Sequence, residues 1–377
     1  MNYLPLILCL LLAGCTGHHP VAGPIPEGVT KIDLETGFRT PPDEVKPRVF
    51  WWWLQGNISR EGILSDLTEM KKAGIKGAIV FDAGSSSFYT GGKVTYSKAV
   101  LLNPPGPGFM SDEWRKLFAY ACQIADSLDL ELSMNITSGW NDGGPWVTPE
   151  YTSKKLVWSE LRVKGPAHLS EKLSLPQGLL KTGDYQEPFY RNVATLAVKQ
   201  TPNSEMVSPL ENIHIKAVHS IGIPMITNGL GYDWGIFMKE EPLVEGDYNT
   251  RLSDVIDISD HVDAGGNIIW DIPEGDYLIL RFGYTGTGIR VSTHSPGGGG
   301  LAIDYMSLAA TKLQYEHTAA IIFKDLSEMG VHSLKYLHDD SWELGAANWT
   351  EGMEEEFNEA NGYDIRRYLP VIAGQII

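Results

Sequence analysis

The sequence is short of positive charge. Among its 377 residues, 30 lysines and arginines stand against 47 aspartates and glutamates, which gives a formal net charge of −17. Proteins that bind nucleic acid or an anionic membrane surface neutralise phosphates with clustered basic side chains. The composition therefore argues against both partners. It is compatible with a neutral or cationic ligand, or with an acidic surface that serves only solubility.

Cysteine is also scarce, with residues only at positions 9, 15 and 122. The first two lie in or beside a leader segment, so Cys122 is expected to have no intramolecular disulfide partner. Cys122 falls beside the apolar stripe of a predicted helix, which is typical of a small buried side chain. No catalytic partner for it is evident in the sequence.

The apolar run near the N-terminus, residues 4–12, is too short to span a bilayer as a mature helix. It is followed by Leu-Ala-Gly-Cys at residues 12–15, a pattern typical of bacterial lipoprotein signals. An ordinary secretory signal with a chance cysteine is the alternative. We predict a signal peptide over residues 1–15 that ends at a lipidated Cys15, and a tether over residues 16–40. The protein would then be exported and lipid-anchored in the cell envelope, in the periplasm or on the outer membrane surface.

The remaining sequence alternates predicted strands and helices. Buried strands are expected at residues 49–54, 77–81, 130–136 and 334–337. Helices are expected after the caps Ser59 and Ser111, from Asp304 to Met329, and from Thr350. Between the third strand and the third helix, short alternating runs predict an all-β insertion. Pro-Glu-Gly-Asp at residues 273–276 is expected to form a hairpin turn between two of these runs.

This order predicts an α/β fold with a parallel sheet, either doubly wound or a (β/α)8 barrel. No glycine-rich phosphate turn follows the first strand, and glycines 297–300 are interpreted as a flexible connection, which weakens the doubly wound alternative. We expect an incomplete (β/α)8 TIM-type barrel made of the first four βα strands, in residues 41–155 and 291–377. A sandwich-like β insertion would occupy residues 156–290. Too few residues follow Glu343 for four more βα units, so the barrel is expected to be truncated.

Side chains that bind hydroxyl groups or move protons follow the predicted strands. They are Gln55, Asn57, Asp82, Asn135, Trp140, Asn141, Asp142, Asp339 and Asp340. Because the carboxyl ends of parallel strands meet on one face, these residues predict a polyol-binding site there. His294 is a further candidate sugar contact, with a surface loop histidine as the alternative.

Glu343 is the candidate catalytic acid. Glycoside cleavage needs one carboxyl group that protonates the leaving oxygen and a second that acts as nucleophile or activates water. The apolar neighbour Trp342 and the nearby Asp339–Asp340 pair would keep such an acid protonated. The alternative is a loop carboxylate without a catalytic role. No Gly-x-Ser-x-Gly elbow is present, which argues against a serine hydrolase.

The Asp339–Asp340 pair has two further interpretations. Its oxygens suit a hard cation such as Ca2+, but no EF-hand-type spacing supports a metal site. Paired aspartates also clamp hydroxyl groups or form turns. The sequence therefore establishes no cofactor and leaves the metal ligands unknown.

Four segments together resemble glycoside hydrolase family 106, the bacterial α-L-rhamnosidases. They are residues 50–57, 139–147, 338–343 and 348–350. The resemblance implies a (β/α)8 catalytic barrel flanked by β domains, and hydrolysis of α-L-rhamnosides with inversion. It implies that Glu343 is the general acid and that a second catalytic carboxylate comes from a later strand that this chain lacks. It also allows for a calcium ion whose ligands we do not assign.

We therefore predict a glycosidase that cleaves terminal α-L-rhamnosyl residues from a plant or bacterial oligo- or polysaccharide. We expect no nucleic-acid partner, and contact with a membrane only through the lipid anchor. Two alternatives stay open: a catalytically incomplete glycan-binding lipoprotein, and a glycosidase of the same architecture with another sugar specificity.

Overall fold

The computed structural model describes residues 34–84, 106–181, 187–201, 250–341 and 347–377. The chain divides into two compact units, Met1–Pro47 and Arg48–Ile377. In the first unit, α1 (Leu34–Arg39) and a 3-10 turn (Asp43–Val45) fall in or next to the segment predicted as a tether. None of the described helices is both long and apolar enough to cross a bilayer.

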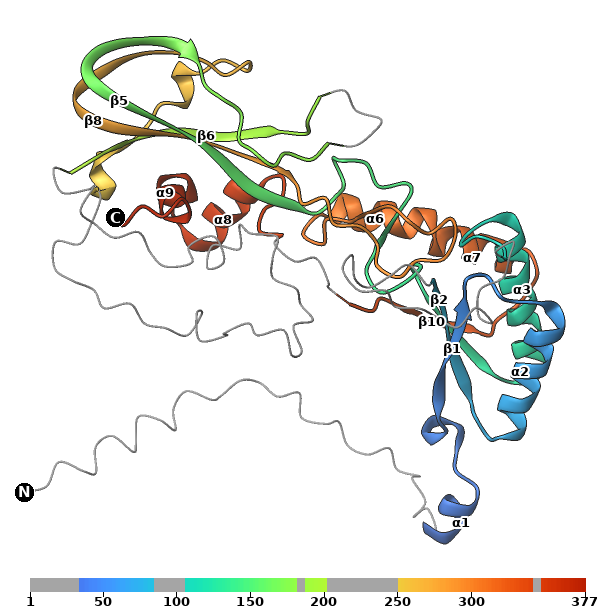
Figure 1. Ribbon diagram of the computed structural model, residues 1–377. Coiled ribbons are helices and arrows are strands. Elements are labelled where there is room, and N and C mark those ends of the chain that lie inside the picture. The colour runs from blue at the N-terminus through green and yellow to red at the C-terminus, as the bar shows by residue number, and fades with distance from the viewer. Residues whose placement is uncertain (1–33, 85–105, 182–186, 202–249, 342–346) are drawn as a thin grey trace, which may run out of the picture. The chain divides into compact units, whose positions relative to one another are not determined.

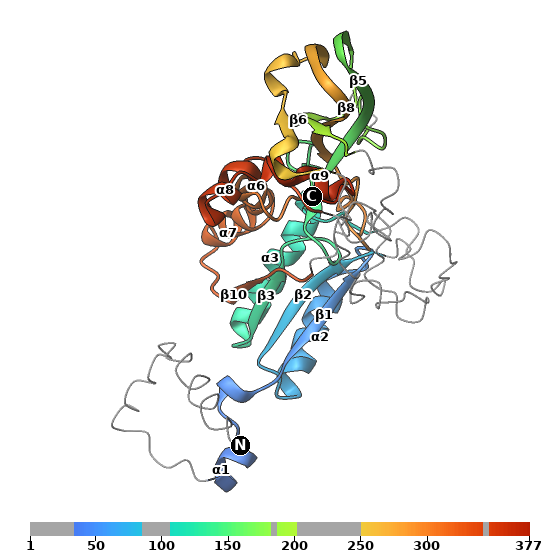
Figure 2. The same ribbon diagram turned by 90° about the vertical axis from the view of Figure 1, so that its left-hand side faces the viewer.

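A parallel sheet of four strands organises the second unit (Figures 1 and 2). Its strands lie in the order β1 (Arg48–Leu54), β2 (Gly77–Ala83), β3 (Glu131–Asn135) and β10 (Leu334–His338). All four predicted strands are confirmed, with small shifts at their ends. Each new strand joins the sheet on the same side as the one before, so the described strands contain no reversal of order. The sheet is open within the described residues, because β1 and β10 are its two edges.

Helices cover one face of this sheet (Figure 1). α2 (Arg60–Lys72) and α3 (Asp112–Ser127) begin after the predicted caps: Ser59 Oγ accepts a hydrogen bond from the Gly62 amide, and Ser111 Oγ accepts one from the Trp114 amide. Alternate residues of a strand point to opposite faces, so every second strand residue meets the helices. The resulting core contains Trp51, Trp53, Ala78, Val80, Leu132 and Met134 from the strands and Ile63, Leu67, Trp114, Phe118 and Ile322 from the helices.

The opposite face of the sheet is aromatic and partly open to solvent. Phe50 and Trp52 stack with ring centroids 5.5 Å apart, yet they remain 52% and 41% exposed. Tyr336 on β10 is 55% exposed. Large aromatic side chains are normally buried against other elements, so this exposure marks a face that the described residues do not cover.

The helix predicted from Asp304 to Met329 is wrong in one respect, because the segment forms two helices. α6 (Leu308–His317) and α7 (Ala319–Ser327) are separated at Thr318, whose backbone leaves the helical region and whose hydroxyl donates to the Gln314 carbonyl. Asp304 lies before α6, which Ser307 caps. Threonine costs little in a helix, so the apolar periodicity could not reveal the break.

The β insertion is one antiparallel sheet in its described part. Its strands are β5 (Lys154–Lys172), β8 (Asn267–Gly286), β6 (Arg191–Lys199) and β7 (Val255–Asp257), in that spatial order. The hairpin turn predicted at residues 273–276 is wrong, because β8 runs straight through them and pairs with β5 along its length (Figure 1). The pairing of β5 with β8 is irregular only between Gly165 and Ala167, where its register shifts. The described part of the insertion is thus all-β and antiparallel but forms a single sheet, and the sandwich-like arrangement stays a prediction.

Each face of this sheet has its own apolar cluster. On one face, Leu280 and Phe282 of β8 are buried with Trp349 and with Leu369, the first residue of α9 (Leu369–Ile372). On the other face, a second cluster is formed by Leu173, Ile258, Ile268, Trp270 and Ile279. The C-terminal segment, which also holds α8 (Met353–Asn361), thus completes the core of a sheet made much earlier in the chain.

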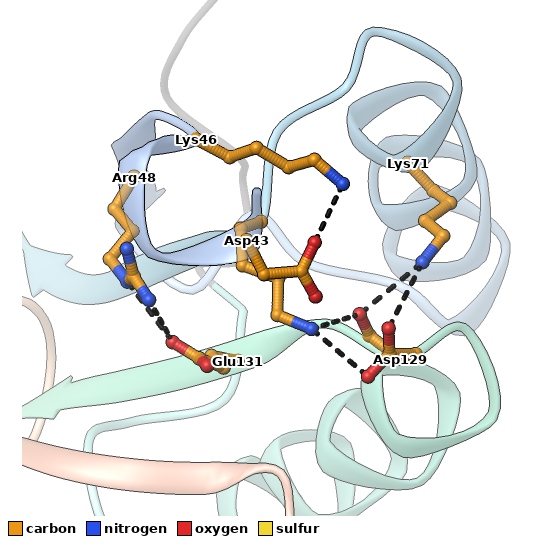
Figure 3. A network of polar contacts seen from close by, with 7 residues as sticks. Asp43, Lys46, Arg48, Lys71, Asp129 and Glu131 are labelled. Carbon is orange, nitrogen blue, oxygen red and sulfur yellow. Dashed lines mark hydrogen bonds and ion pairs between the residues drawn. The ribbon is translucent and has the colours of Figure 1, made fainter. Parts of the chain in front are cut away.

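Charged side chains connect the starting ends of the parallel strands (Figure 3). Arg48 of β1 pairs with Glu131 of β3, and Lys71 and Lys76 lie 3.6 and 3.0 Å from carboxylate oxygens of Asp129. These ion pairs lie at the end of the sheet opposite to the candidate site residues. Their role is therefore structural.

Candidate active site

Two loops that follow parallel strands lie together at the carboxyl end of the sheet. We call residues 136–146 the β3 loop and the described residues 339–341 and 347–350 the β10 loop. The Ile136 amide donates to the His338 carbonyl at 3.0 Å, and the Ser341 amide donates to the Trp140 carbonyl at 3.1 Å. The structure thus brings together the two segments that carry most of the predicted site residues.

Asp82, at the end of β2, is 1% exposed and binds its neighbours with both carboxylate oxygens. Oδ1 accepts hydrogen bonds from the Ser138 and Ser295 hydroxyls, and Oδ2 accepts one from Trp114 Nε1 at 2.9 Å. Burial raises the pKa of Asp82 to about 6, although these hydrogen bonds lower it. The predicted sugar contact is thus placed inside a buried polar network.

Asn135 and Asn141 are also buried, and their amide groups hold the β3 loop. Asn135 Nδ2 donates to the carbonyls of Thr137 and Gly139, and Asn141 Oδ1 accepts from the Ser292 amide at 2.9 Å. The remaining amide atoms, Asn135 Oδ1 and Asn141 Nδ2, are buried without a hydrogen-bond partner. Their described contacts are structural, and a role in sugar binding stays a prediction.

Among the acids in the described part of the site, Asp142 has the pKa that is shifted furthest from its ordinary value. Its side chain is buried, and its Oδ1 has no hydrogen-bond partner. Burial, together with the negative charge of Asp339, raises the pKa of Asp142 to about 8. At neutral pH Asp142 therefore carries a proton, and it is a neutral acid beside a second carboxyl group.

Asp339 and Asp340 differ in their surroundings. Asp339 is exposed as a residue, but partial burial of its carboxyl group raises the pKa, and the charge of Asp340 adds to this effect. Asp340 is half-buried; its Oδ1 lies 3.2 Å from His338 Nε2, and its Oδ2 accepts from the Ser341 hydroxyl at 2.6 Å. One aspartate is thus open to solvent, while the other is held by its neighbours.

A cluster of aromatic rings includes Trp140 of the β3 loop and His338 at the end of β10. Trp140 packs against Trp52 and Phe81 with centroid distances of 5.5 and 5.3 Å, and Phe81 lies 5.9 Å from His338. Apolar ring faces of this kind pack against the carbon faces of sugars. Gln55 and Asn57 lie in the turn after β1, where Gln55 is half-buried and Asn57 is exposed.

The segment before β9 (Leu301–Ala302) packs closely against the β3 loop. A Cβ on Gly300 would collide with the Gly144 carbonyl, and a Cβ on Gly139, whose φ is +93°, would collide with the Ser292 carbonyl. The interpretation of glycines 297–300 as a flexible connection is therefore wrong. His294 is half-buried, and its Nδ1 lies 2.9 Å from the Ser295 carbonyl oxygen.

Several residues that secure the site were not predicted from the sequence. Lys154 Nζ lies 2.9 Å from Asp304 Oδ2 in a fully buried ion pair, and the Thr350 hydroxyl donates to the same oxygen. Asn348 Oδ1 accepts from the Leu156 amide at 2.8 Å. The segment 348–350 was singled out only by resemblance, and its contacts explain that signal: it fastens the β insertion to the β10 loop.

Three predicted residues lie outside the described residues: Cys15, Trp342 and Glu343. The described residues also contain no group of three or more His, Cys, Asp or Glu side chains that could hold a metal ion. The ligands of the calcium ion that the resemblance allows for stay unassigned, and we assign no step of a reaction to a metal.

A protonated carboxyl group, a second acid and aromatic rings at the ends of parallel strands are features of a glycoside hydrolase site. The comparison with protein families agrees. The family model described as alpha-L-rhamnosidase matches residues 39–377, so the chain belongs to glycoside hydrolase family 106. The expectation from the sequence motifs is thereby confirmed.

Two related proteins are informative. A protein of Formosa agariphila named "Putative beta-glucuronidase" is 31% identical over 347 residues, which cover 92% of this chain and 27% of that protein. The solved rhamnosidase structure from Novosphingobium sp. PP1Y matches with a TM-score of 0.65 at 23% identity, over 92% of this chain and 43% of that one. The second match shows a shared fold. The chain thus spans about a quarter of the curated relative and less than half of the solved structure.

Proposed function

We propose that this chain belongs to an enzyme that removes terminal α-L-rhamnosyl residues from plant or bacterial polysaccharide, with inversion at the anomeric carbon. The observation that carries the proposal is the joining of the two motif-bearing loops. The hydrogen bond from Ser341 to Trp140 fixes the β10 loop two residues before Glu343 in the sequence. Family membership and the printed name of the solved rhamnosidase support the same sugar.

In the proposed reaction, Glu343 donates a proton to the leaving glycosidic oxygen. A second carboxylate, which we do not assign, activates a water molecule on the opposite face of the sugar. Inversion requires the two groups to be about 6.5–9.5 Å apart. Asp142 and Asp339 would contribute a proton donor and an acceptor for the sugar hydroxyl groups, and the ring of Trp140 would face the carbon skeleton.

The test is hydrolysis of aryl α-L-rhamnosides by a longer version of the protein, taken as the wild type, and by its variant Glu343→Gln. We expect the variant to lose about 10²–10⁴-fold in kcat for a poor leaving group such as 4-methoxyphenol. A 2,4-dinitrophenyl rhamnoside, which needs no acid, should still be cleaved. Glu355→Gln, at an exposed glutamate of α8, is the matched control.

The first product seen by NMR should be β-L-rhamnose. Turnover that Glu343→Gln leaves unchanged, or a first product with retained configuration, would contradict the proposal. Binding of rhamnosides without turnover would instead favour a glycan-binding protein.

A second candidate function, cleavage of β-glucuronides, is favoured by the name of the curated relative. A uronic acid carries a carboxylate, which proteins usually bind with arginine or lysine. The candidate residues, however, include the four acids Asp82, Asp142, Asp339 and Asp340 and no arginine or lysine. This charge favours a neutral sugar. An aryl β-glucuronide assayed beside the rhamnoside separates the two functions.

We further propose that the parallel sheet is the first half of a (β/α)8 barrel. Support comes from the strand order without reversal, and from the helices on one face only of the sheet. In a barrel, the open aromatic face would point to the interior. Acrylamide quenching tests this: Trp52 fluorescence should be accessible in the 377-residue chain and protected in a longer version of the protein.

Export and lipid anchoring through Cys15 are also proposed, on the sequence pattern of residues 4–15. Radiolabelled palmitate should enter the wild-type protein in bacterial cells and not the variant Cys15→Ser. Equal labelling of both would contradict the anchor.

A further inference from the structure

Tyr305 connects the two loops of the candidate site. The segment before α6 carries Tyr305, and its hydroxyl oxygen accepts a hydrogen bond from the Asp142 amide at 2.6 Å. The same hydroxyl donates to the Ser341 carbonyl in a long hydrogen bond of 3.5 Å. One phenol group thus contacts the β3 loop and the β10 loop at the same time.

The Ser341 peptide is held on both sides. Its amide donates to the Trp140 carbonyl, and its carbonyl accepts from Tyr305. Trp140 and Asp142 lie in the same loop, so the β10 loop is fixed to the β3 loop at two points. Ser341 precedes Glu343 by two residues in the sequence.

Tyr305 is itself fixed by its neighbours in the sequence. The Ile303 amide donates to the Asp142 carbonyl at 3.1 Å, so the backbone before Tyr305 runs against the β3 loop. Asp304 is anchored by Lys154 at 2.9 Å and by Thr350 at 2.8 Å. The phenol group therefore projects from a rigid base, which a positioning residue needs.

We propose that Tyr305 is a positioning residue that holds the peptide before Glu343 in place for proton donation. The proposal rests on the proposed function, in which Glu343 is the acid. Tyr305 takes no part in the chemical step. Its hydroxyl sets the spacing between the β3 loop, which carries Asp142, and the β10 loop, which leads to Glu343.

The variant Tyr305→Phe tests this, because it removes the hydroxyl and keeps the ring that packs near Val147 and Ile303. Tyr315→Phe is the matched control, since this tyrosine lies on α6 and is 43% exposed. The first measurement is hydrogen–deuterium exchange of the 377-residue chain, resolved by peptide, and it needs no activity.

We expect exchange of the Asp142 and Ser341 amides to rise about fivefold to tenfold in Tyr305→Phe, as for the loss of one hydrogen bond. Amides of β1 and β2 should not change, and Tyr315→Phe should match the wild type throughout. A rise at Asp142 without a rise at Ser341 would overturn the proposal, because the two loops would then not be coupled through Tyr305. Unchanged exchange at both amides would overturn it as well.

The second measurement compares leaving groups. A displaced acid harms only substrates that need protonation, so kcat/KM of Tyr305→Phe should fall about tenfold more for 4-methoxyphenyl than for 2,4-dinitrophenyl α-L-rhamnoside. An equal fall for both substrates would indicate a general loss of structure and would overturn the positioning role. If the wild-type protein cleaves neither rhamnoside, the proposed function fails, while the exchange measurement still decides whether Tyr305 couples the loops.

Discussion

Replacing Asp142 by asparagine should make the protein more stable at alkaline pH. Asp142 is buried, its Oδ1 has no hydrogen-bond partner, and the charge of Asp339 lies nearby. Ionisation of this carboxyl group inside the fold is therefore unfavourable. An amide has nearly the same shape and cannot ionise, so the variant escapes this cost.

The size and sign of the effect follow from the pKa. The pKa of Asp142 is about 8 in the folded protein, against 3.8 for an unperturbed aspartate. Below pH 4 both states are protonated and Asp142 has no effect on stability. Between pH 4 and pH 8 the folded protein holds a proton that the unfolded chain has released, so stability falls as pH rises. Above pH 8 the accumulated loss amounts to about 6 kcal/mol.

The assay is urea denaturation followed by tryptophan fluorescence at several values between pH 4.5 and pH 9. Wild-type stability should fall across this range, and Asp142→Asn should lose most of the slope and gain several kcal/mol at pH 8.5. Asp112→Asn, at a side chain that is 83% exposed, is the control and should follow the wild type. Parallel pH profiles for wild type and Asp142→Asn would refute the reasoning.

Two further predictions concern the supports of the site. Lys154→Met should lower the free energy of unfolding, measured by urea denaturation, by about 3–5 kcal/mol, because it leaves the buried Asp304 carboxylate unpaired. The control Lys164→Met, at an 81% exposed side chain, should lower it by less than about 1 kcal/mol. Similar losses for both variants would contradict a special role of the buried pair. Gly139→Ala should cost clearly more than about 1 kcal/mol, because of both its φ of +93° and the collision with a carbonyl. Gly330→Ala, with a positive φ but open space, should cost only about 1 kcal/mol, and equal values would rule out the close approach at Gly139.

The sequence predicted the features that depend on short-range patterns. Buried parallel strands are continuous apolar runs, and the hydroxyls of Ser59 and Ser111 cap the helices that follow them. The gathering of the candidate residues at the carboxyl ends of the strands followed from the parallel order alone, while their role as a site stays a prediction. These predictions succeeded because each rests on residues that are close together in the chain.

Features that depend on distant partners could not be predicted. Pro-Glu-Gly-Asp at residues 273–276 suits a hairpin turn as well as an irregular stretch of one strand, and only the pairing with β5 decides between them. The type of residue at Asp82 and Asn135 suggested sugar contacts. The bonds of Asp82 to Ser138 and Ser295 depend on segments far away in the sequence, whereas Asn135 bonds to Gly139, in the loop that directly follows it.

The order in which the core of the β insertion is completed has a consequence for biosynthesis. β8 presents Leu280 and Phe282 to Trp349 and Leu369, which the ribosome adds only after α6, α7 and β10. Domains generally fold as the chain emerges, N-terminal part first. Here one face of the insertion stays open, with its apolar side chains exposed, until Trp349 and Leu369 leave the exit tunnel. Chaperones that shield nascent chains would find their binding site on β8 during this interval.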